Sequence, residues 1–119
     1  MAKGFESLEN RTLIEKTGNT ACVTFSIPDS SPYFDGHFPG FPILPAVAQV
    51  ELVVRFCCDY LGTGIAVSRI KRMKFIKLIR PSMKVLLRLE LNNDILNFKL
   101  VSPEGDDIYS QGTIAVEKA

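Results

Sequence analysis

His37 is the only histidine in this chain of 119 residues, and Glu51 is an acid placed inside an apolar run. Both lie in the segment GHFPGFPILPAVAQVE, which extends from Gly36 to Glu51. An unperturbed imidazole titrates close to neutral pH, so His37 is a candidate general base or acid. A carboxyl within an apolar helix is costly to bury unless it has a partner or a purpose. Together, the two residues suggest proton-transfer chemistry.

Both side chains also have a purely structural interpretation. His37 precedes Phe-Pro-Gly and could be a loop histidine beside a turn. Glu51, Arg55 and Asp59 are spaced four residues apart, so on a helix they would form one surface stripe. Such a stripe contributes only a few tenths of a kcal/mol per pair. The residue types alone leave both interpretations open.

The sequence changes from loop to helix close to Pro45. Residues 28–42, PDSSPYFDGHFPGFP, are rich in Pro, Gly, Ser and Asp and predict a loop that its prolines stiffen. Pro45 fits the first turn of a helix, and AVAQVELVVRFCCDYL continues that helix to about Leu61, with Gly62 as a natural end. The helix is apolar on almost every side, so we expect it to be buried all round.

Strand patterns lie on both sides of this helix. RTLIEK (11–16) and ACVTFSI (21–27) come before it, and alternating apolar segments at 84–91, 96–100 and 108–116 come after it. Residues 65–79 also resemble a strand but alternate poorly, which suggests a bulge or a change of burial along the strand. One helix cannot cover both faces of a parallel sheet, so we predict an α+β fold with an antiparallel sheet wrapped around the helix. No linker or repeat is visible, which predicts one domain over residues 1–119.

Composition narrows the class of protein. The chain is 46% hydrophobic, has a net charge of +1 and lacks the roughly 18-residue apolar stretch of a membrane span. Its start, MAKGFESLEN, does not resemble a secretory signal, so we expect a soluble cytoplasmic protein. The three cysteines, Cys22, Cys57 and Cys58, have no metal-binding spacing, and we interpret them as buried thiols in a reducing compartment.

Basic residues are concentrated in one stretch, although the net charge is small. Between residues 69 and 84 the chain has no acid but carries Arg69, Lys71, Arg72, Lys74, Lys77, Arg80 and Lys84. Such a stretch could be the solvated face of a strand, or it could attract an acidic partner. Nucleic-acid binding is a further option, but no known binding motif accompanies the charges.

The segment around His37 resembles the active-site signature of the hotdog-fold 3-hydroxyacyl-acyl carrier protein dehydratases, roughly G-H-F-P-x-x-P-x-x-P-G-V-x-x-x-E. Eight positions match in register: Gly36, His37, Phe38, Pro39, Pro42, Pro45, Val47 and Glu51. The chain departs from the family at Ala46, where Gly is usual, and at Arg55, where Gln is frequent. It looks closer to the divergent dehydratases of specialised acyl chains, such as aryl polyenes. The order of the expected elements also fits a hotdog fold, with a long central helix in a curled antiparallel sheet.

The resemblance implies dehydration of a 3-hydroxyacyl thioester to the trans-2-enoyl thioester. His37 would remove a proton from the carbon beside the carbonyl, and Glu51 would protonate the departing hydroxyl, directly or through a water. The backbone N–H of Ala46 would bind the thioester carbonyl at the positive end of the helix dipole. The resemblance also makes Phe38, Pro39 and Gly40 candidate substrate-binding residues.

The same resemblance carries expectations about partners. It implies a homodimer or a higher oligomer in which His37 and Glu51 come from different subunits, and no metal or redox cofactor. Acyl carrier protein is strongly acidic, so part of the basic stretch is a candidate docking surface: Lys71, Arg72, Lys74 and Lys77. Two alternatives stay open, a hotdog acyl-thioesterase and an acyl-binding hotdog protein with little turnover.

Overall fold

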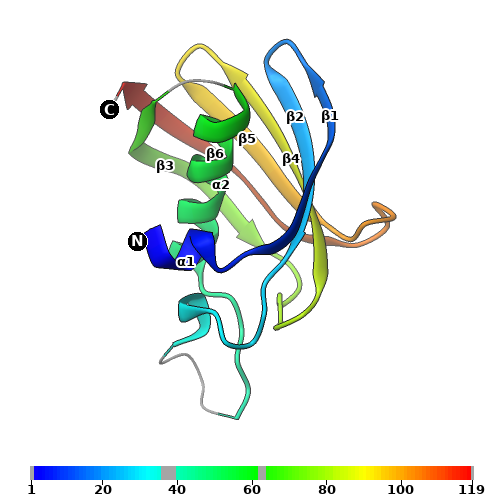
Figure 1. The fold of residues 1–119 in the computed structure, drawn as a ribbon. Helices are drawn as coiled ribbons and strands as arrows, with labels where there is room; N and C mark the ends of the chain where they lie inside the picture. Colours follow the sequence, from blue (N-terminus) through cyan, green and yellow to red (C-terminus); the bar gives the residue numbers. More distant parts are fainter. Residues whose placement is uncertain (1, 36–39, 62–63, 119) are drawn as a thin grey trace.

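One long helix packs against one six-stranded sheet in the computed structural model, which describes residues 2–35, 40–61 and 64–118 (Figure 1). A short helix α1 (Ala2–Glu6) is followed by strands β1 (Glu9–Thr17) and β2 (Thr20–Ser26), the 3₁₀ helix η1 (Pro32–Phe34) and the helix α2 (Ala46–Leu61). The strands β3 (Ile65–Phe75), β4 (Lys84–Asn92), β5 (Ile95–Val101) and β6 (Ile108–Lys118) complete the chain.

All neighbouring strands of the sheet are antiparallel, in the order β1-β2-β4-β5-β6-β3. The sheet curves around α2, which lies along its concave side (Figure 1). The prediction of an α+β fold with a curved antiparallel sheet around one helix is therefore confirmed. The poorly alternating segment is β3, and its pairing with β6 shifts register twice, between Val67 and Arg69 and between Ile70 and Arg72. These shifts confirm the expected irregularity.

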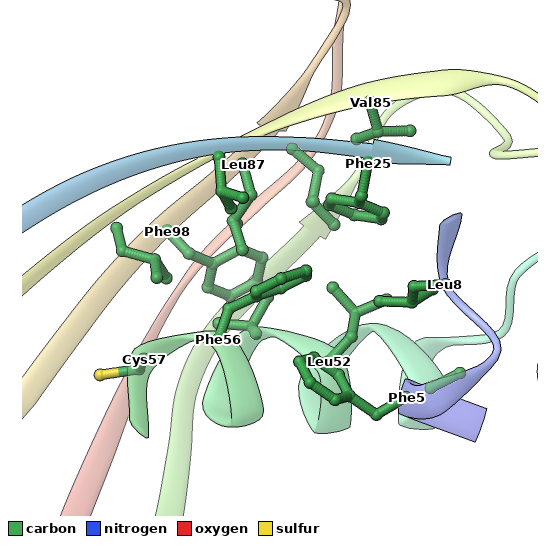
Figure 2. Packing of buried hydrophobic residues seen from close by; sticks show 14 of the residues in the cluster. Phe5, Leu8, Phe25, Leu52, Phe56, Cys57, Val85, Leu87 and Phe98 are labelled. Carbon is green, nitrogen blue, oxygen red and sulfur yellow. The ribbon is translucent and has the colours of Figure 1, made fainter. Parts of the chain in front are cut away.

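The core fills the space between α2 and the concave face of the sheet. Phe56 of α2 is fully buried and meets Phe5 of α1 and Phe25 of β2, with ring centroids 4.8 and 5.1 Å away. Figure 2 shows Phe56 pointing from the helix toward Phe25, Leu87 and Phe98 of the sheet. Large apolar side chains at alternate positions of the strands supply the other wall, because alternate residues of a strand share one face.

The helix α2 differs in two respects from the expectation. It begins at Ala46 rather than at Pro45, because Pro45 caps it: the Pro45 carbonyl accepts the first helical hydrogen bond, from Gln49 N at 3.1 Å. Within this chain the helix is also not buried all round, since the sheet covers only one of its faces. Val47 is 74% exposed, and Val50 and Val54 are half-buried.

Two other expectations need correction. Only Cys57 is a buried thiol, whereas Cys22 and Cys58 are half-exposed, and all three cysteines are free. Burial and the neighbouring Cys58 raise the pKa of the Cys57 thiol to about 11. The short elements α1 and η1 were not expected from the sequence; α1 packs on α2, and η1 lies close to α1.

Strand β3 forms one edge of the sheet and has two chemically different faces. Its apolar residues Val67, Ile70 and Phe75 pair with inward-facing residues of β6, so they lie on the helix side of the sheet. They are nonetheless 39%, 47% and 51% exposed, because nothing described in this chain covers that edge. Arg72 and Lys74 pair with Thr113 and Gln111 and lie on the outer face. The edge is therefore apolar on one side and cationic on the other.

Candidate active site

Glu51 lies in the first half of α2 and has a tyrosine as a direct partner. The Tyr33 hydroxyl of η1 donates a hydrogen bond to Glu51 Oε2, with 2.6 Å between the oxygens. Burial, followed by the hydrogen bond and the negative charge of Glu51, raises the pKa of Tyr33 well above its ordinary value. The proton of this bond therefore stays on the tyrosine.

The ionisation of Glu51 reflects opposing influences. Burial by itself would raise the pKa of the carboxyl. Hydrogen bonding, in part from Tyr33, and positive charge, in part from Arg55, outweigh this effect and hold the pKa of Glu51 below its ordinary value. Glu51 is consequently a carboxylate at neutral pH in this arrangement.

A hollow of about 350 Å³ opens beside this carboxylate. The start of α2 forms one wall, and α1 and the η1 region form the other. Its lining residues are Gly4, Pro32, Tyr33, Asp35, Pro45, Val47, Ala48 and Glu51. The lining is mostly apolar with a few convergent polar groups, which is typical of a small-molecule site.

Ala46 faces a second hollow, of about 280 Å³, on another side of the same helix start. This hollow lies between residues 43–46 and the segment that follows β3, and Phe75, Ile76 and Leu78 contribute much of its apolar wall. Ala46 and Glu51 therefore line different hollows of one chain.

Buried hydrogen bonds fix the start of α2. The Gln49 side chain is 4% exposed; its Nε2 donates to the Leu44 carbonyl at 3.1 Å. Its Oε1 accepts a hydrogen bond of 2.7 Å from the Ser110 hydroxyl of β6. These contacts anchor the loop before the helix to the sheet, so the backbone N–H groups of the first turn are held in a defined direction.

Several expected site residues lie outside the described part of the chain. His37, Phe38 and Pro39 fall in the segment 36–39, so their positions remain predictions. Gly40 is described: it is exposed and has a φ of +83°, a conformation that favours glycine. Phe41 is 46% exposed, and the Arg80 guanidinium lies over its ring, 4.1 Å from the centroid.

Arg55 is held by an aromatic ring. Its guanidinium lies 4.7 Å from the centroid of the Phe5 ring, and Arg11 lies 4.4 Å from the same centroid. The positive charge of Arg55 nonetheless acts on Glu51 and favours the carboxylate. Arg55 and Glu51 thus interact electrostatically, as expected for residues one helical turn apart.

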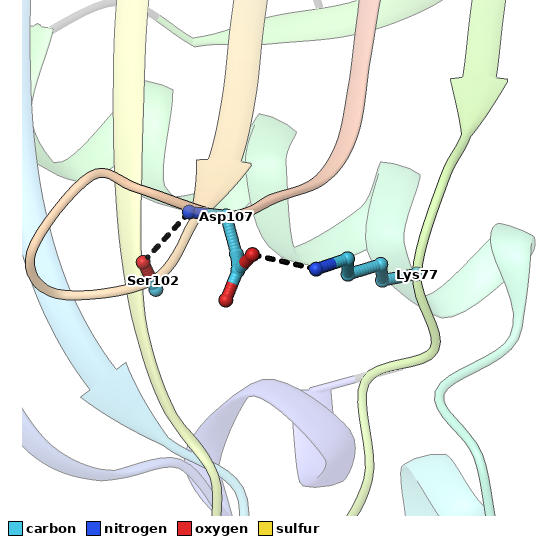
Figure 3. A network of polar contacts seen from close by, with 3 residues as sticks. All are labelled: Lys77, Ser102 and Asp107. Atoms are coloured by element: carbon cyan, nitrogen blue, oxygen red, sulfur yellow. Dashed lines mark hydrogen bonds and ion pairs between the residues drawn. The ribbon is translucent and has the colours of Figure 1, made fainter.

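The expected docking residues fall into two groups. Lys71, Arg72 and Lys74 are exposed on β3. Lys77 lies beyond the strand and forms an ion pair of 2.5 Å with Asp107, which Ser102 also contacts (Figure 3). A hollow of about 550 Å³ on the outer face of the sheet is lined in part by Arg72, Arg88 and Lys99. This hollow lies on the opposite face from Glu51, so its size does not make it the reaction site.

Sequence reasoning missed Tyr33. The only signal available was its place in the aromatic segment PYFDGHF, four positions before His37. Nothing in that spacing predicts that its hydroxyl reaches a helix residue eighteen positions later. The contact depends on how η1 and α2 pack together.

Two absences apply to the described part of the chain alone. Across residues 2–35, 40–61 and 64–118, no three or more His, Cys, Asp or Glu side chains gather as metal ligands would. Within the same ranges, no helix has both the length and the apolar character needed to cross a membrane.

Solved structures reproduce the architecture. The dehydratase heterocomplex ApeI:P from Xenorhabdus doucetiae is 27% identical, with a TM-score of 0.77 over 90% of this chain and 97% of that chain. An uncharacterised protein from Erwinia carotovora subsp. atroseptica is 29% identical, with a TM-score of 0.74 over 93% of this chain and 94% of its own. The PaaI protein of the phenylacetic acid degradation operon of E. coli, at 11% identity and a TM-score of 0.66, covers 98% of this chain and 86% of that one and shares the fold alone. The expected hotdog fold is thereby confirmed.

Sequence relatives point in the same direction. The 3-hydroxyacyl-[acyl-carrier-protein] dehydratase FabZ of Syntrophobacter fumaroxidans is 28% identical over 66% of this chain and 59% of its own length. This chain spans 59% to 65% of the length of three such FabZ relatives. The family model of ApeI-like proteins, described as ApeI dehydratase, matches residues 13–113. The resemblance to hotdog dehydratases of the aryl-polyene type is confirmed, and the chain belongs to the ApeI-like dehydratase family.

Proposed function

We propose that this protein removes water from a 3-hydroxyacyl thioester to give the trans-2-enoyl thioester. The observation that carries the proposal is the Glu51 carboxylate, which lies at a mostly apolar hollow beside the start of α2 in a chain of the ApeI-like family. FabZ relatives are named as dehydratases of 3-hydroxyacyl groups on acyl carrier protein, and we propose the same substrate class here.

The reaction needs a base, an acid and a site for negative charge. We assign His37 to the removal of the proton beside the carbonyl. The protonated form of Glu51, a minor form at neutral pH because its pKa is lowered, would donate its proton to the departing hydroxyl, directly or through a water, so that the hydroxyl leaves as water. The backbone N–H of Ala46 follows Pro45, which has none, and would stabilise the developing charge on the thioester oxygen. Phe38, Pro39 and Gly40 would line the substrate beside His37. No metal or redox cofactor is required by this scheme.

The two hollows support a site built from two chains. Ala46 and Glu51 line different hollows of one chain, as expected if each residue belongs to a different site of a two-chain assembly. In a dimer, Glu51 of one chain could serve the carbonyl site and His37 of the other. This arrangement is the one that the family resemblance implies.

Exposed apolar surface beside the site supports the same conclusion. Val47 on α2 lines the Glu51 hollow, whereas Phe75 at the end of β3 and Ile76 and Leu78 beyond it line the Ala46 hollow. These four side chains are 45% to 74% exposed. Ile70 continues this surface along the edge strand. A second copy of the chain that covers this surface would complete the burial of α2. A heterocomplex, as in the Xenorhabdus relative, is the alternative.

We also propose that the outer face of β3 docks the acyl carrier protein in the cytoplasm. Arg72 and Lys74 lie on that face beside Arg88 and Lys99, and an acidic carrier would be attracted there. Lys71 belongs to the same exposed strand, whereas Lys77 is already paired with Asp107. Changing Arg72 and Lys74 to Gln should lower kcat/KM for a carrier-bound substrate more than for a small-thiol analogue. Lys77→Gln is the matched control, and equal losses with both substrates would refute docking on this face.

The proposed activity is tested by incubating the purified protein with 3-hydroxyacyl thioesters. A dehydratase forms the enoyl thioester, which is detected by its ultraviolet absorbance and by mass. Release of free thiol would instead identify a thioesterase. Tight binding without either product would identify an acyl-binding protein and contradict the proposed function.

A further inference from the structure

Tyr33 has a place in the site that neither the family signature nor the proposed roles of the other residues give it. Its hydroxyl is 2.6 Å from Glu51 Oε2, and its ring lines the same hollow as that carboxylate. Tyr33 is 8% exposed, so this polar group is held inside the protein and directed at the acid. A buried hydroxyl usually has a hydrogen-bond partner, and here the partner is the proposed catalytic carboxylate.

The protein holds Tyr33 from several directions. Ser31, which is 1% exposed, caps η1 by accepting a hydrogen bond from Tyr33 N at 3.1 Å. The Ser31 hydroxyl also lies 2.6 Å from the Ser7 hydroxyl, which ties this segment to the end of α1. A Cβ added at Gly4 would lie 2.4 to 2.8 Å from three ring carbons of Tyr33, so only glycine leaves room for the ring. The position of the hydroxyl is therefore built into the fold.

The charged groups around the pair come from several elements. Arg55 of α2 acts on both Glu51 and Tyr33, and Arg11 of β1 acts on Tyr33. Asp35, after η1, lines the hollow, whereas the contribution of α1 to its lining is the uncharged Gly4. Tyr33 is one partner of Glu51 and not its sole one. Among the described groups, it is the one whose direct hydrogen bond to the carboxylate is observed.

We propose that Tyr33 is a positioning residue for dehydration, whose hydroxyl holds Glu51 Oε2 in its orientation at the hollow. This inference rests on the proposed function for its catalytic meaning. A hydrogen bond to the charged form of an acid favours that form. Tyr33 thus keeps Glu51 ionised to lower pH and fixes the direction in which the carboxylate faces the hollow.

The matched test compares Tyr33→Phe with Tyr60→Phe. Both variants lose only a hydroxyl, but Tyr60 stacks on Phe56 farther along α2, with centroids 6.0 Å apart. The Glu51 pKa is measured by carboxyl carbon NMR of the full chain, with Glu51→Gln used to assign the signal. Tyr33→Phe should raise the Glu51 pKa, because it removes a hydrogen bond that favours the charged form of the carboxyl. Tyr60→Phe should leave that pKa unchanged.

The pH dependence of kcat/KM then tests whether the Tyr33–Glu51 hydrogen bond affects the reaction. The limb of the kcat/KM profile that reports Glu51 should move to higher pH in Tyr33→Phe by the same amount as the NMR value. An unchanged Glu51 pKa in folded Tyr33→Phe would overturn the inference, and so would a shifted pKa with an unmoved kinetic limb. If the parent protein forms no enoyl product, the proposed function fails by itself, and the NMR comparison still tests the Tyr33–Glu51 pair.

Discussion

Residues in the two halves of α2 differ in how completely one chain buries them. In the second half, Phe56 and Cys57 are fully buried against α1 and the sheet, and their contacts are complete within one chain. In the first half, Val47 is 74% exposed and Glu51 faces a hollow. One chain therefore buries Phe56 and Cys57 completely, whereas it leaves Val47 and Glu51 at the surface.

This difference in burial indicates which residues of α2 have a role other than stabilising the fold. A helix start with an exposed valine and a carboxylate beside an apolar hollow contributes little to the stability of a single chain. The same features are useful if a second chain and a substrate complete the surroundings. We therefore expect changes at core-facing positions of α2, such as Phe56, to act on stability and changes at Val47 and Glu51 to act on activity or assembly.

The largest effect on stability is expected at Phe56. Phe56→Ala would leave a cavity among Phe5, Phe25 and Leu52 and should lower the free energy of unfolding by about 3–5 kcal/mol. Asp59→Ala, on the exposed side of the same half of the helix, should change it by less than about 0.5 kcal/mol. Chemical denaturation measures both values, and equal effects would contradict the assignment of this half to the core.

The largest effect on activity is expected at Glu51. Glu51→Gln keeps the size of the side chain but removes its acid, so kcat should fall by about 10²- to 10⁴-fold. The denaturation midpoint should stay close to that of the parent, because the Glu51 side chain faces a hollow and not the core. A folded Glu51→Gln protein with parental turnover would remove Glu51 from the mechanism.

An intermediate effect is expected at the β3 edge. Ile70→Lys would place a charge where we expect a partner chain and should raise the dimer dissociation constant at least about tenfold. Ile14→Lys makes the same change on β1, at the opposite edge of the sheet, where Ile14 is 59% exposed. Analytical ultracentrifugation measures the dimer dissociation constant of both variants. A weakening by Ile14→Lys but not by Ile70→Lys would move the interface to the other edge.

The smallest effect is expected at Arg55. Its positive charge favours the Glu51 carboxylate, so Arg55→Gln should raise the Glu51 pKa and extend the protonated form to higher pH. The effect should be smaller than that of the direct Tyr33 hydrogen bond, because Arg55 stacks on Phe5 and acts through a partly solvated region. If the pH profile of kcat/KM for Arg55→Gln overlays the parent profile, Arg55 has a packing role and does not influence the ionisation of Glu51.

Local sequence patterns were sufficient for the architecture. The apolar run after Pro45 predicted α2, and alternation at Val85, Leu87 and Leu89 predicted a strand with one buried face, because periodicity reports which face meets the core. The short elements α1 and η1 escaped prediction since they have too few residues to show a period. Their stability comes from contacts with distant segments.

The site was only partly predictable for the same reason. Glu51 could be proposed as a site residue from its spacing to His37 and from the resemblance of this segment to a known signature. The Tyr33–Glu51 hydrogen bond could not, because it depends on the packing of η1 on α2. Spacing also cannot reveal that Ala46 and Glu51 of one chain open onto different hollows.

The most direct test of the account is complementation between two inactive variants. The His37→Ala and Glu51→Gln variants should each be inactive when purified alone. The two variants are then co-expressed with different tags and purified as a mixture. If a site takes His37 from one chain and Glu51 from the other, half of the sites in a mixed dimer are intact. Random pairing should then restore about one quarter of parental enoyl-thioester formation. A mixture that contains the mixed dimer by native mass spectrometry but forms no enoyl product would contradict the two-chain site.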